Sequence, residues 1–206
     1  MSDVGAEVRG LLGKYGLRPK HGLGQNFLVG SRVFDQILAA IALLPEDWVV
    51  EVGAGLGTLT KRILTAVPDG RVVALERDAA MHQVLGTELA GYANLELWLG
   101  DAVEFDLAAV AARAGRPIIV AGNLPYQISS PMLRRLEEGW RFIRRAVFML
   151  QREVAARLVA AAGSDDYGSL SVMLPLHYDV RLVTRVGRTA FIPSPKVESA
   201  VVLLEA

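Results

Sequence analysis

The stretch Glu51-Val52-Gly53-Ala54-Gly55-Leu56-Gly57-Thr58 decides the fold; it overlaps a short apolar run at 48–52 and leads into a helical pattern at 58–67. Glycines at a strand-to-helix turn let the backbone approach a ligand closely and adopt dihedral angles that other residues resist. A dinucleotide-binding fingerprint requires a third glycine at position 58, where Thr58 stands instead. The acidic Glu51 disfavours a pyrophosphate and suits a ligand that carries a cationic amino or sulfonium group. A turn with a purely structural role is the alternative interpretation.

Apolar runs and helical patterns alternate around this turn. Strands are expected at 48–52, 71–75, 94–99, 117–121 and 146–150, and helices at 33–44, 58–67, 79–89 and, as a long helix, after residue 150. Strands that alternate with helices at this spacing predict a parallel sheet covered on both faces. Near the C-terminus, 179–186 and 199–204 are expected to be strands with no helix between them, so an antiparallel hairpin completes the α/β fold.

The composition narrows the class of protein. A chain of 206 residues suffices for one α/β domain, and no apolar run reaches the 18 residues that suggest a transmembrane helix. The chain has no cysteine, its three histidines are scattered, and its first residues lack the pattern of a secretory signal. We therefore expect a soluble, cytoplasmic protein without disulfides or a metal site.

The net charge is zero, but the charges are segregated along the chain. Residues 1–32 carry a net charge of +3, residues 33–116 of −6 and residues 134–196 of +5. Basic segments on either side of an acidic middle are consistent with binding to a nucleic acid. Ordinary solvated surface explains the same pattern, so the charges alone do not decide the function.

Two further carboxylates follow predicted strands. Glu76 ends the second run, about twenty residues after the glycine turn, where an acidic residue accepts hydrogen bonds from ribose hydroxyls. Asp101 follows the third run and can accept a hydrogen bond from the amino group of an adenine. Alternatively, Glu76 is a solvated strand end and Asp101 is the N-cap of the next helix. The order and spacing of the three strands that end in carboxylates favour a nucleoside-like ligand.

The segment Gly122-Asn123-Leu124-Pro125-Tyr126 follows the fourth predicted strand. An adenine amino nitrogen is a poor nucleophile because its lone pair is delocalised into the ring. The Asn123 side-chain oxygen and the Leu124 carbonyl can each accept one of its hydrogens, and Tyr126 offers a face on which a flipped-out base can stack. Pro125 stiffens the turn. The alternative is an ordinary Asn-Pro turn beside a core tyrosine.

With these segments in place, the sequence resembles the ribosomal RNA adenine dimethyltransferase family, and more closely its small-subunit branch. The matching blocks run from about residue 17 to the end and include Leu23-Gly24-Gln25-Asn26-Phe27-Leu28, the glycine turn, Gly100-Asp101-Ala102, 122–131, 148–154, 167–171 and 191–199. The resemblance implies the class I S-adenosylmethionine-dependent methyltransferase fold. This is a Rossmann-like, mostly parallel seven-stranded sheet with a C-terminal antiparallel hairpin.

The resemblance also implies roles for individual residues. The expected contacts to S-adenosylmethionine are Asn26, Leu28, Gly53, Gly55, Glu76, Asp101 and Asn123. Asn123, Leu124 and Tyr126 are expected to hold the target base, with Phe191 across the base from Tyr126 unless Phe191 is a buried loop aromatic. Unless they merely face solvent, the arginines expected to contact RNA phosphates are Arg134, Arg135, Arg141, Arg144, Arg145, Arg152 and Arg157.

The same resemblance predicts the organisation of the chain. Residues 1–30 are expected to form an N-terminal arm that covers the cofactor, and residues 31–206 to form the catalytic domain. The small helical domain that usually follows in this family is expected to be absent.

The expected function is dimethylation of the N6 amino groups of two adjacent adenines in the 3′-terminal hairpin of 16S rRNA, during ribosome biogenesis. The expected partner is an immature small ribosomal subunit, approached by a monomer away from any membrane. The alternatives are the large-subunit branch linked to macrolide resistance, a DNA adenine methyltransferase, and an assembly factor that has lost catalysis. Leu124 and Pro131 favour the small-subunit branch, and the flanking blocks are not those of the DNA enzymes.

Overall fold

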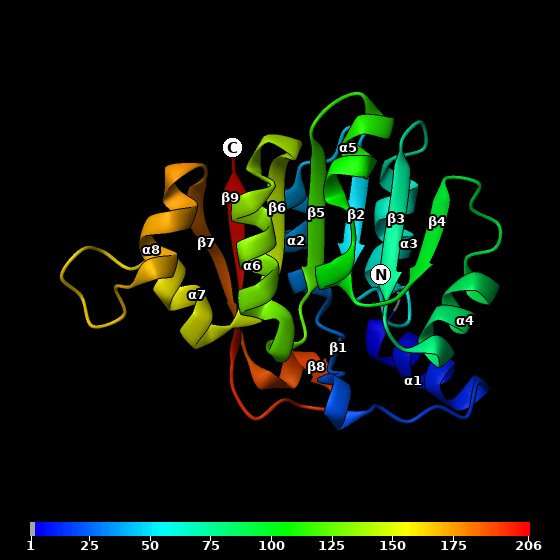
Figure 1. The fold of residues 1–206 in the computed structure, drawn as a ribbon. Coiled ribbons are helices and arrows are strands. Elements are labelled where there is room, and N and C mark those ends of the chain that lie inside the picture. Colours follow the sequence, from blue (N-terminus) through cyan, green and yellow to red (C-terminus); the bar gives the residue numbers. More distant parts are fainter. Residues whose placement is uncertain (1–2) are drawn as a thin grey trace.

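The computed structural model describes residues 3–206, which contain a seven-stranded sheet with helices on both faces (Figure 1). The strand order is β4-β3-β2-β5-β6-β9-β7. The strands are β2 (Trp48–Val52), β3 (Arg71–Glu76), β4 (Leu95–Leu99), β5 (Ile118–Asn123), β6 (Ile143–Gln151), β7 (Asp179–Val186) and β9 (Ser199–Glu205). The first five are parallel, and β9 runs antiparallel between β6 and β7. The predicted parallel sheet with an antiparallel end is therefore confirmed.

Helices cover the two faces in two groups. One face packs against α2 (Ser31–Ile41), α3 (Thr58–Ala66) and α4 (Ala79–Glu88), and α1 (Val4–Lys14) joins this layer. The other face packs against α5 (Leu107–Ala114), α6 (Ser129–Glu138), α7 (Arg152–Leu158) and α8 (Ser169–Met173). Within residues 3–206, no helix has the length and apolar character needed to cross a membrane.

Alternate residues of the central strands enter two separate cores. Val49 of β2 and Ala121 of β5 lie in the core beside α2 and α3, whereas Val50 and Val120 lie in the core beside α5 and α6. Strands buried on both faces need apolar residues at every position. Burying a side chain such as valine stabilises the fold by roughly 1.5–3 kcal/mol. This double burial is why these strands are visible in the sequence as largely apolar runs, with Glu51 of β2 as an exception.

The structure differs from the sequence prediction after β6. The prediction of a long helix there was wrong, because α7 has only 7 residues. The residues at 161–169 that follow are all exposed, so no apolar face is present to hold a longer helix against the sheet.

A small second sheet was not predicted at all. β1 (Phe27–Leu28) pairs antiparallel with β8 (Phe191–Ile192), with Leu28 opposite Phe191. This pair lies below the main sheet in Figure 1 and joins the N-terminal segment to the loop before β9. Two segments more than 160 residues apart in sequence are thereby held together.

The carboxyl ends of the parallel strands meet at one edge of the sheet, the lower edge in Figure 1. The glycine turn follows β2, Glu76 ends β3 and Asn123 ends β5. The chain between α1 and β1 passes beneath this edge. The polar groups singled out in the sequence are therefore brought to the same side of the molecule.

Candidate active site

A cavity of about 280 Å³ lies at the carboxyl edge, between the glycine turn and residues 22–28. All seven residues predicted to contact the cofactor line it: Asn26, Leu28, Gly53, Gly55, Glu76, Asp101 and Asn123. The structure therefore brings together a set that spans almost one hundred residues of sequence.

The glycine turn and Glu76 form one hydrogen-bonded unit. Gly53 and Gly55 have φ angles of 73° and 58°, a conformation that favours glycine. The Gly55 N–H donates to Glu76 Oε2 at 2.7 Å, and the Asp78 N–H donates to Glu76 Oε1 at 2.8 Å. Burial raises the pKa of Glu76, and these backbone hydrogen bonds oppose the rise. Each carboxylate oxygen keeps a lone pair, so Glu76 can accept both hydroxyls of a ribose.

Asp101 caps a turn and also lines the cavity. Its Oδ1 accepts a hydrogen bond from the Val103 N–H at 3.1 Å, at the start of the short 3₁₀ helix Ala102–Glu104. Its Oδ2 lies 3.5 Å from Nη1 of Arg77. Because carboxylate oxygens accept several hydrogen bonds, the capping role leaves room for an amino group in the cavity.

Glu51 is the most deeply buried carboxylate of the cavity, with 2% of its surface exposed. Among the described residues, Glu51 Oε2 has no hydrogen-bond partner, and neither has Oγ1 of the neighbouring Thr60. Burial raises the pKa of Glu51 to about 8, and the charge of Glu76 adds to this shift. The nearby Thr60 hydroxyl acts in the opposite direction and lowers the pKa by more than the charge of Glu76 raises it, but burial outweighs it. A cation in the cavity fits this unpaired carboxylate.

Asn123 is oriented by the chain that passes beneath the sheet. Its Nδ2 donates to the main-chain oxygen of Asn26 at 2.9 Å. A carbonyl oxygen only accepts, so the amide nitrogen must face Asn26 and Oδ1 is left for a donor. The Leu124 side chain is buried in the core, and its N–H donates to the Met149 carbonyl at 3.1 Å. This fixes the turn from which the Leu124 carbonyl projects.

The two predicted aromatic contacts lie outside the cavity lining. Tyr126 is half-buried and begins the 3₁₀ helix Tyr126–Ile128, while Phe191 is 5% exposed and packs in the core beside α2. Neither ring is among the described residues that line the cavity. The sequence alternative of a buried loop aromatic describes the position of Phe191 in this structure.

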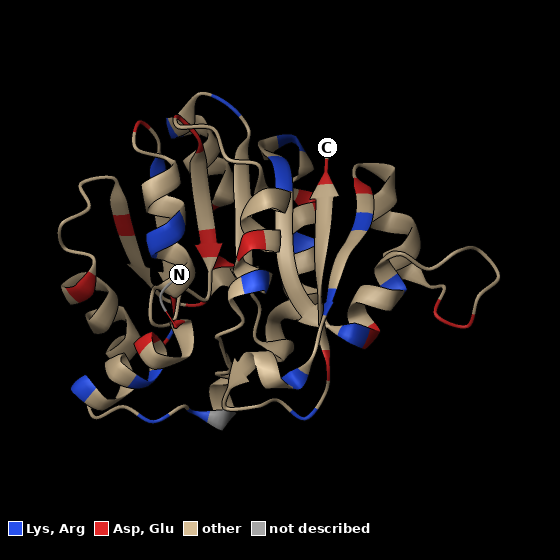
Figure 2. Ribbon diagram, turned by 180° about the vertical axis from the view of Figure 1, so that it is seen from behind, with Lys and Arg blue, Asp and Glu red and all other residues tan. Residues whose placement is uncertain are grey.

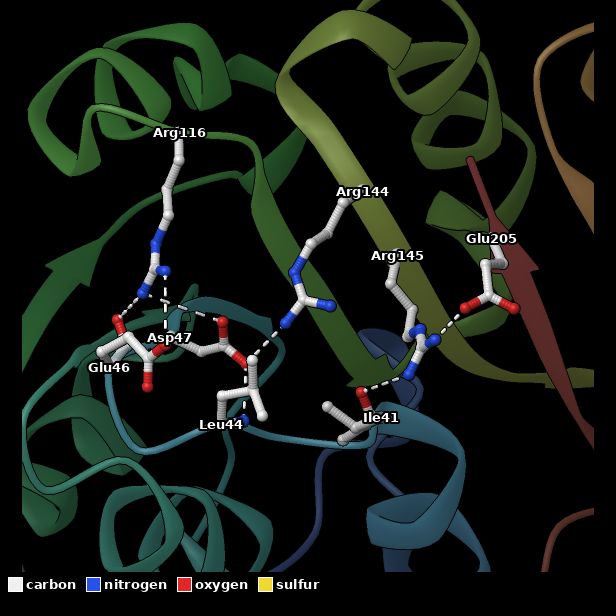
Figure 3. Close-up of polar contacts among 8 residues, drawn as sticks. All are labelled: Ile41, Leu44, Glu46, Asp47, Arg116, Arg144, Arg145 and Glu205. Atoms are coloured by element: carbon white, nitrogen blue, oxygen red, sulfur yellow. Dashed lines mark hydrogen bonds and ion pairs between the residues drawn. The ribbon is translucent and has the colours of Figure 1, made fainter.

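Lys and Arg residues lie at both edges of the sheet (Figure 2). Arg144 and Arg145, near the start of β6, belong to the edge opposite the cavity. Arg144 Nη2 lies 2.6 Å from Asp47 Oδ2, and Arg145 donates to the Ile41 carbonyl at 3.1 Å and pairs with Glu205 (Figure 3). Six residues of strand, roughly 20 Å, separate Arg145 from the carboxyl end of β6. The structure does not bring these two arginines to the cavity.

The other predicted arginines differ in position. Arg134 pairs with Glu138 at 3.1 Å on α6, and Arg135 donates to the Phe105 carbonyl at 3.1 Å. Arg152 is exposed at the carboxyl end of β6, 3.1 Å from Glu198. The remaining two are on the surface. Arg141 lies over the Trp140 ring, and Arg157 pairs with Glu153.

Several cavity residues were not predicted as ligand contacts. Gln25, Arg77 and Gln127 line the cavity next to residues that were predicted. Their only signal in the sequence was this proximity, because polar side chains of these types are common on any surface.

A sheet in this strand order, with a glycine turn after its first long strand and carboxylates after its neighbours, defines a class I S-adenosylmethionine-dependent methyltransferase. The chain belongs to the ribosomal RNA adenine dimethylase family, whose model matches residues 16–206. It is thus an S-adenosylmethionine-dependent rRNA adenine dimethyltransferase. Within residues 3–206, no group of three or more His, Asp or Glu side chains is placed to hold a metal ion.

Known proteins resemble the chain over most of its length. Ribosomal RNA small subunit methyltransferase A of Anaeromyxobacter dehalogenans is 45% identical, over 98% of this chain and 72% of the relative. A dimethyladenosine transferase from Plasmodium falciparum is 31% identical with a TM-score of 0.77, over 87% of this chain and 62% of that one. The 23S rRNA methyltransferase ErmE is 27% identical with a TM-score of 0.76, over 87% and 69% respectively.

Cofactor binding is expected to release a proton from Glu51. With a pKa of about 8, Glu51 is mostly protonated at pH 7 in the free site, and the positive charge of S-adenosylmethionine favours its ionised form. Affinity for the cofactor should therefore rise with pH up to about 8 and then level off. Calorimetry at pH 7 in buffers of different ionisation enthalpy measures the proton directly. Glu51→Gln should remove this release, and a release that persists in the variant would refute the assignment.

Arg144→Ala is expected to weaken the fold without affecting catalysis. The side chain of Asp47 is 4% exposed and that of Arg144 34%, so the loss should cost about 2 kcal/mol, less than for a fully buried pair. Urea unfolding measures this, and methyl transfer is assayed well below the transition. Arg152→Ala, in an exposed pair at the carboxyl edge, is the control and should leave stability within about 0.5 kcal/mol. If folded Arg144→Ala protein loses activity, the result would support the predicted contact between Arg144 and RNA.

Proposed function

We propose that this chain transfers two methyl groups to the N6 of each of two adjacent adenosines in the 3′-terminal hairpin of small-subunit ribosomal RNA. The observation that carries the chemistry is the orientation of Asn123, whose amide nitrogen is engaged by Asn26 and whose oxygen is free to accept. An adenosine amino group is a donor of the required kind. The relative that is 45% identical is named for the small ribosomal subunit, which supports this source of substrate.

The residues of the chain act by positioning the amino group. When Asn123 Oδ1 and the Leu124 carbonyl each accept one of its hydrogens, the nitrogen lone pair leaves conjugation with the ring and can attack a methyl carbon, after which the nitrogen gives up one proton to solvent. S-adenosylmethionine, when bound, would supply the methyl group from a sulfonium already activated for transfer, whose sulfur would leave as a neutral thioether. Glu76, Asp101 and Glu51 hold the ribose, the adenine amino group and the cationic end. Orientation of this kind can contribute roughly 7–11 kcal/mol to lowering the barrier.

We assign Tyr126 the first stacking contact with the target base. It follows Pro125, which lines the cavity, and its ring is partly exposed. Phe191 is proposed as the opposite face of the stack. Because Phe191 is 5% exposed, stacking on its ring requires the ring to become accessible when RNA binds. Base stacking on an aromatic side chain contributes roughly 1–3 kcal/mol.

The RNA backbone is proposed to follow the carboxyl edge from Asn123 towards β7. Asn123 lies opposite Met149, Met149 opposite Val201, and Val201 opposite Thr184. Thr184 is therefore three strand spacings from Asn123, about 14 Å. Exposed cations follow it and continue along this edge: Arg185, Arg188 and Lys196, with Arg152 beside them. Arg134 and Arg135 on α6 are a second proposed contact with phosphates.

The wider context follows from this substrate. We propose that the chain acts as a monomer on an immature small subunit in the cytoplasm, where its target hairpin is still accessible. Residues 1–30 are proposed to cover the cofactor and residues 31–206 to carry out catalysis. The cavity is lined by both of these parts, which supports this division of roles.

Asn123→Ala is expected to lower kcat by about 100- to 1000-fold, because it removes a group that acts on the reacting nitrogen. The affinity for S-adenosylmethionine should change only a few-fold. Tritiated-methyl transfer and calorimetry measure the two effects. Asn94→Ala is the matched control, since Asn94 Nδ2 bonds the Val67 carbonyl at 2.9 Å on a distant turn. Unchanged turnover in Asn123→Ala would remove Asn123 from the mechanism.

The substrate is tested by offering immature small subunits, large subunits and naked rRNA separately. Label should enter the small subunit at two adjacent adenosines, located by stops in reverse transcription. Label found only in the large subunit would support the alternative branch. No label in any substrate, with cofactor binding intact, would point to an assembly factor without catalysis.

A further inference from the structure

Residues 20–26, here called the strap, pass along the cofactor cavity. Five consecutive strap residues, 22–26, line the cavity. Apart from one turn of 3₁₀ helix, His21–Leu23, the strap has no regular secondary structure. A segment of this kind keeps its conformation only through contacts with the rest of the molecule.

Asp78 holds the strap on the cofactor side. Its Oδ1 accepts a hydrogen bond from Lys20 Nζ at 2.8 Å, and its Oδ2 accepts one from Gln25 Nε2 at 2.8 Å. The Gln25 amide is itself oriented, because its Oε1 accepts from the Lys20 N–H at 2.8 Å. Burial acts to raise the pKa of Asp78, but the hydrogen bonds from Lys20 and Gln25 outweigh it and lower the pKa. Charge-assisted hydrogen bonds to a buried carboxylate are strong ones.

The far end of the strap holds the reacting side of the site. The Asn26 carbonyl accepts from Asn123 Nδ2 at 2.9 Å, and the Asn26 side chain donates back to the Gly24 carbonyl at 3.1 Å. Gln127 Nε2 reaches the Gly22 carbonyl at 3.4 Å. Displacement of the strap therefore frees the Asn123 amide to rotate, and its oxygen then no longer has a fixed direction.

We propose that Asp78 is a positioning residue for methyl transfer. Its hydrogen bonds to Lys20 and Gln25 hold the strap against the cavity, and the strap in turn orients the Asn123 amide. This inference rests on the role proposed for Asn123. Asp78 is not among the described residues that line the cavity. It acts through the strap and through its N–H, which donates to Glu76 Oε1. One anchor thus serves both the affinity for the cofactor and the rate of the reaction.

Two variants weaken the hydrogen bonds between Asp78 and the strap, one by changing the strap and the other by changing Asp78. Lys20→Met keeps the aliphatic stem and removes the ammonium. Asp78→Asn keeps an N-cap for α4, since Asn caps as well as Asp, but it presents a donor where Gln25 also donates. In both variants the Kd for S-adenosylmethionine should rise about tenfold, the effect of losing one charge-assisted hydrogen bond. The kcat should fall about tenfold, and amide hydrogen exchange should accelerate at residues 20–28 while the sheet stays protected.

Lys14→Met is the matched control. Lys14 Nζ lies 2.6 Å from Glu88 Oε1 and so also bridges the N-terminal segment to α4, but at the other end of that helix. This variant should leave Kd, kcat and exchange in the strap unchanged. Lys20→Arg keeps the positive charge and should have values of all three close to those of the wild-type protein. Equal behaviour of Lys20→Met and Lys14→Met would overturn the proposal. Faster exchange throughout the chain in Asp78→Asn, without a specific effect at 20–28, would do the same.

The readouts separate this proposal from the proposed function. Cofactor affinity and hydrogen exchange are measured without RNA, so they test the strap whichever rRNA is methylated. If the variants behave as expected but wild-type protein does not label small subunits, the proposed substrate fails and the role of Asp78 in closing the strap stands.

Discussion

Strands that are buried on both faces can offer polar side chains to a ligand only where they end, because within the sheet such groups lose water without gaining a partner. In this chain β3, β2 and β5 are neighbours and end at one edge. Their ends lie within two strand spacings, about 10 Å. The glycine turn, Glu76 and Asn123 therefore stand close enough to hold a single nucleoside-sized ligand. The cofactor site follows from the direction and order of the strands.

The same burial leaves the acidic groups dependent on their partners. Glu76 is satisfied by two backbone N–H groups, and Asp78 by Lys20 and Gln25 of the strap. Glu51 alone of these three keeps a buried oxygen without a partner in the described structure. Protonation is one way to relieve that cost, and a bound cation is the other. The raised pKa of Glu51 and the fit of a cationic cofactor thus have the same cause, which is the cost of a buried negative charge without a partner.

The parts of the site that the sequence predicted are those whose signal is local. Glu76, Asp101 and Asn123 each follow an apolar run, and the end of a buried strand marks its edge without knowledge of the rest of the fold. The pairing of Lys20 with Asp78 could not be predicted, because ordinary charged residues 58 positions apart carry no joint pattern. β1 and β8 have two residues each, too few to show the alternation of a strand. The resemblance implied an RNA contact for Arg144, and nothing in the sequence indicated its pairing with Asp47, which lies 97 residues away.

The pairing of β1 with β8 connects the segment that lines the cofactor cavity to the loop that carries Phe191. Leu28, two residues beyond Asn26, lies opposite Phe191, and the Val29 N–H donates to the Ala190 carbonyl at 2.8 Å. If the target base stacks on Phe191, the ring must leave its packing against this same pair of strands. Because the strap runs directly into β1, such a movement cannot occur independently of the segment that orients Asn123. The pairing of β1 with β8 and the hydrogen bond from Asn123 to Asn26 therefore couple access to the Phe191 ring to the orientation of Asn123.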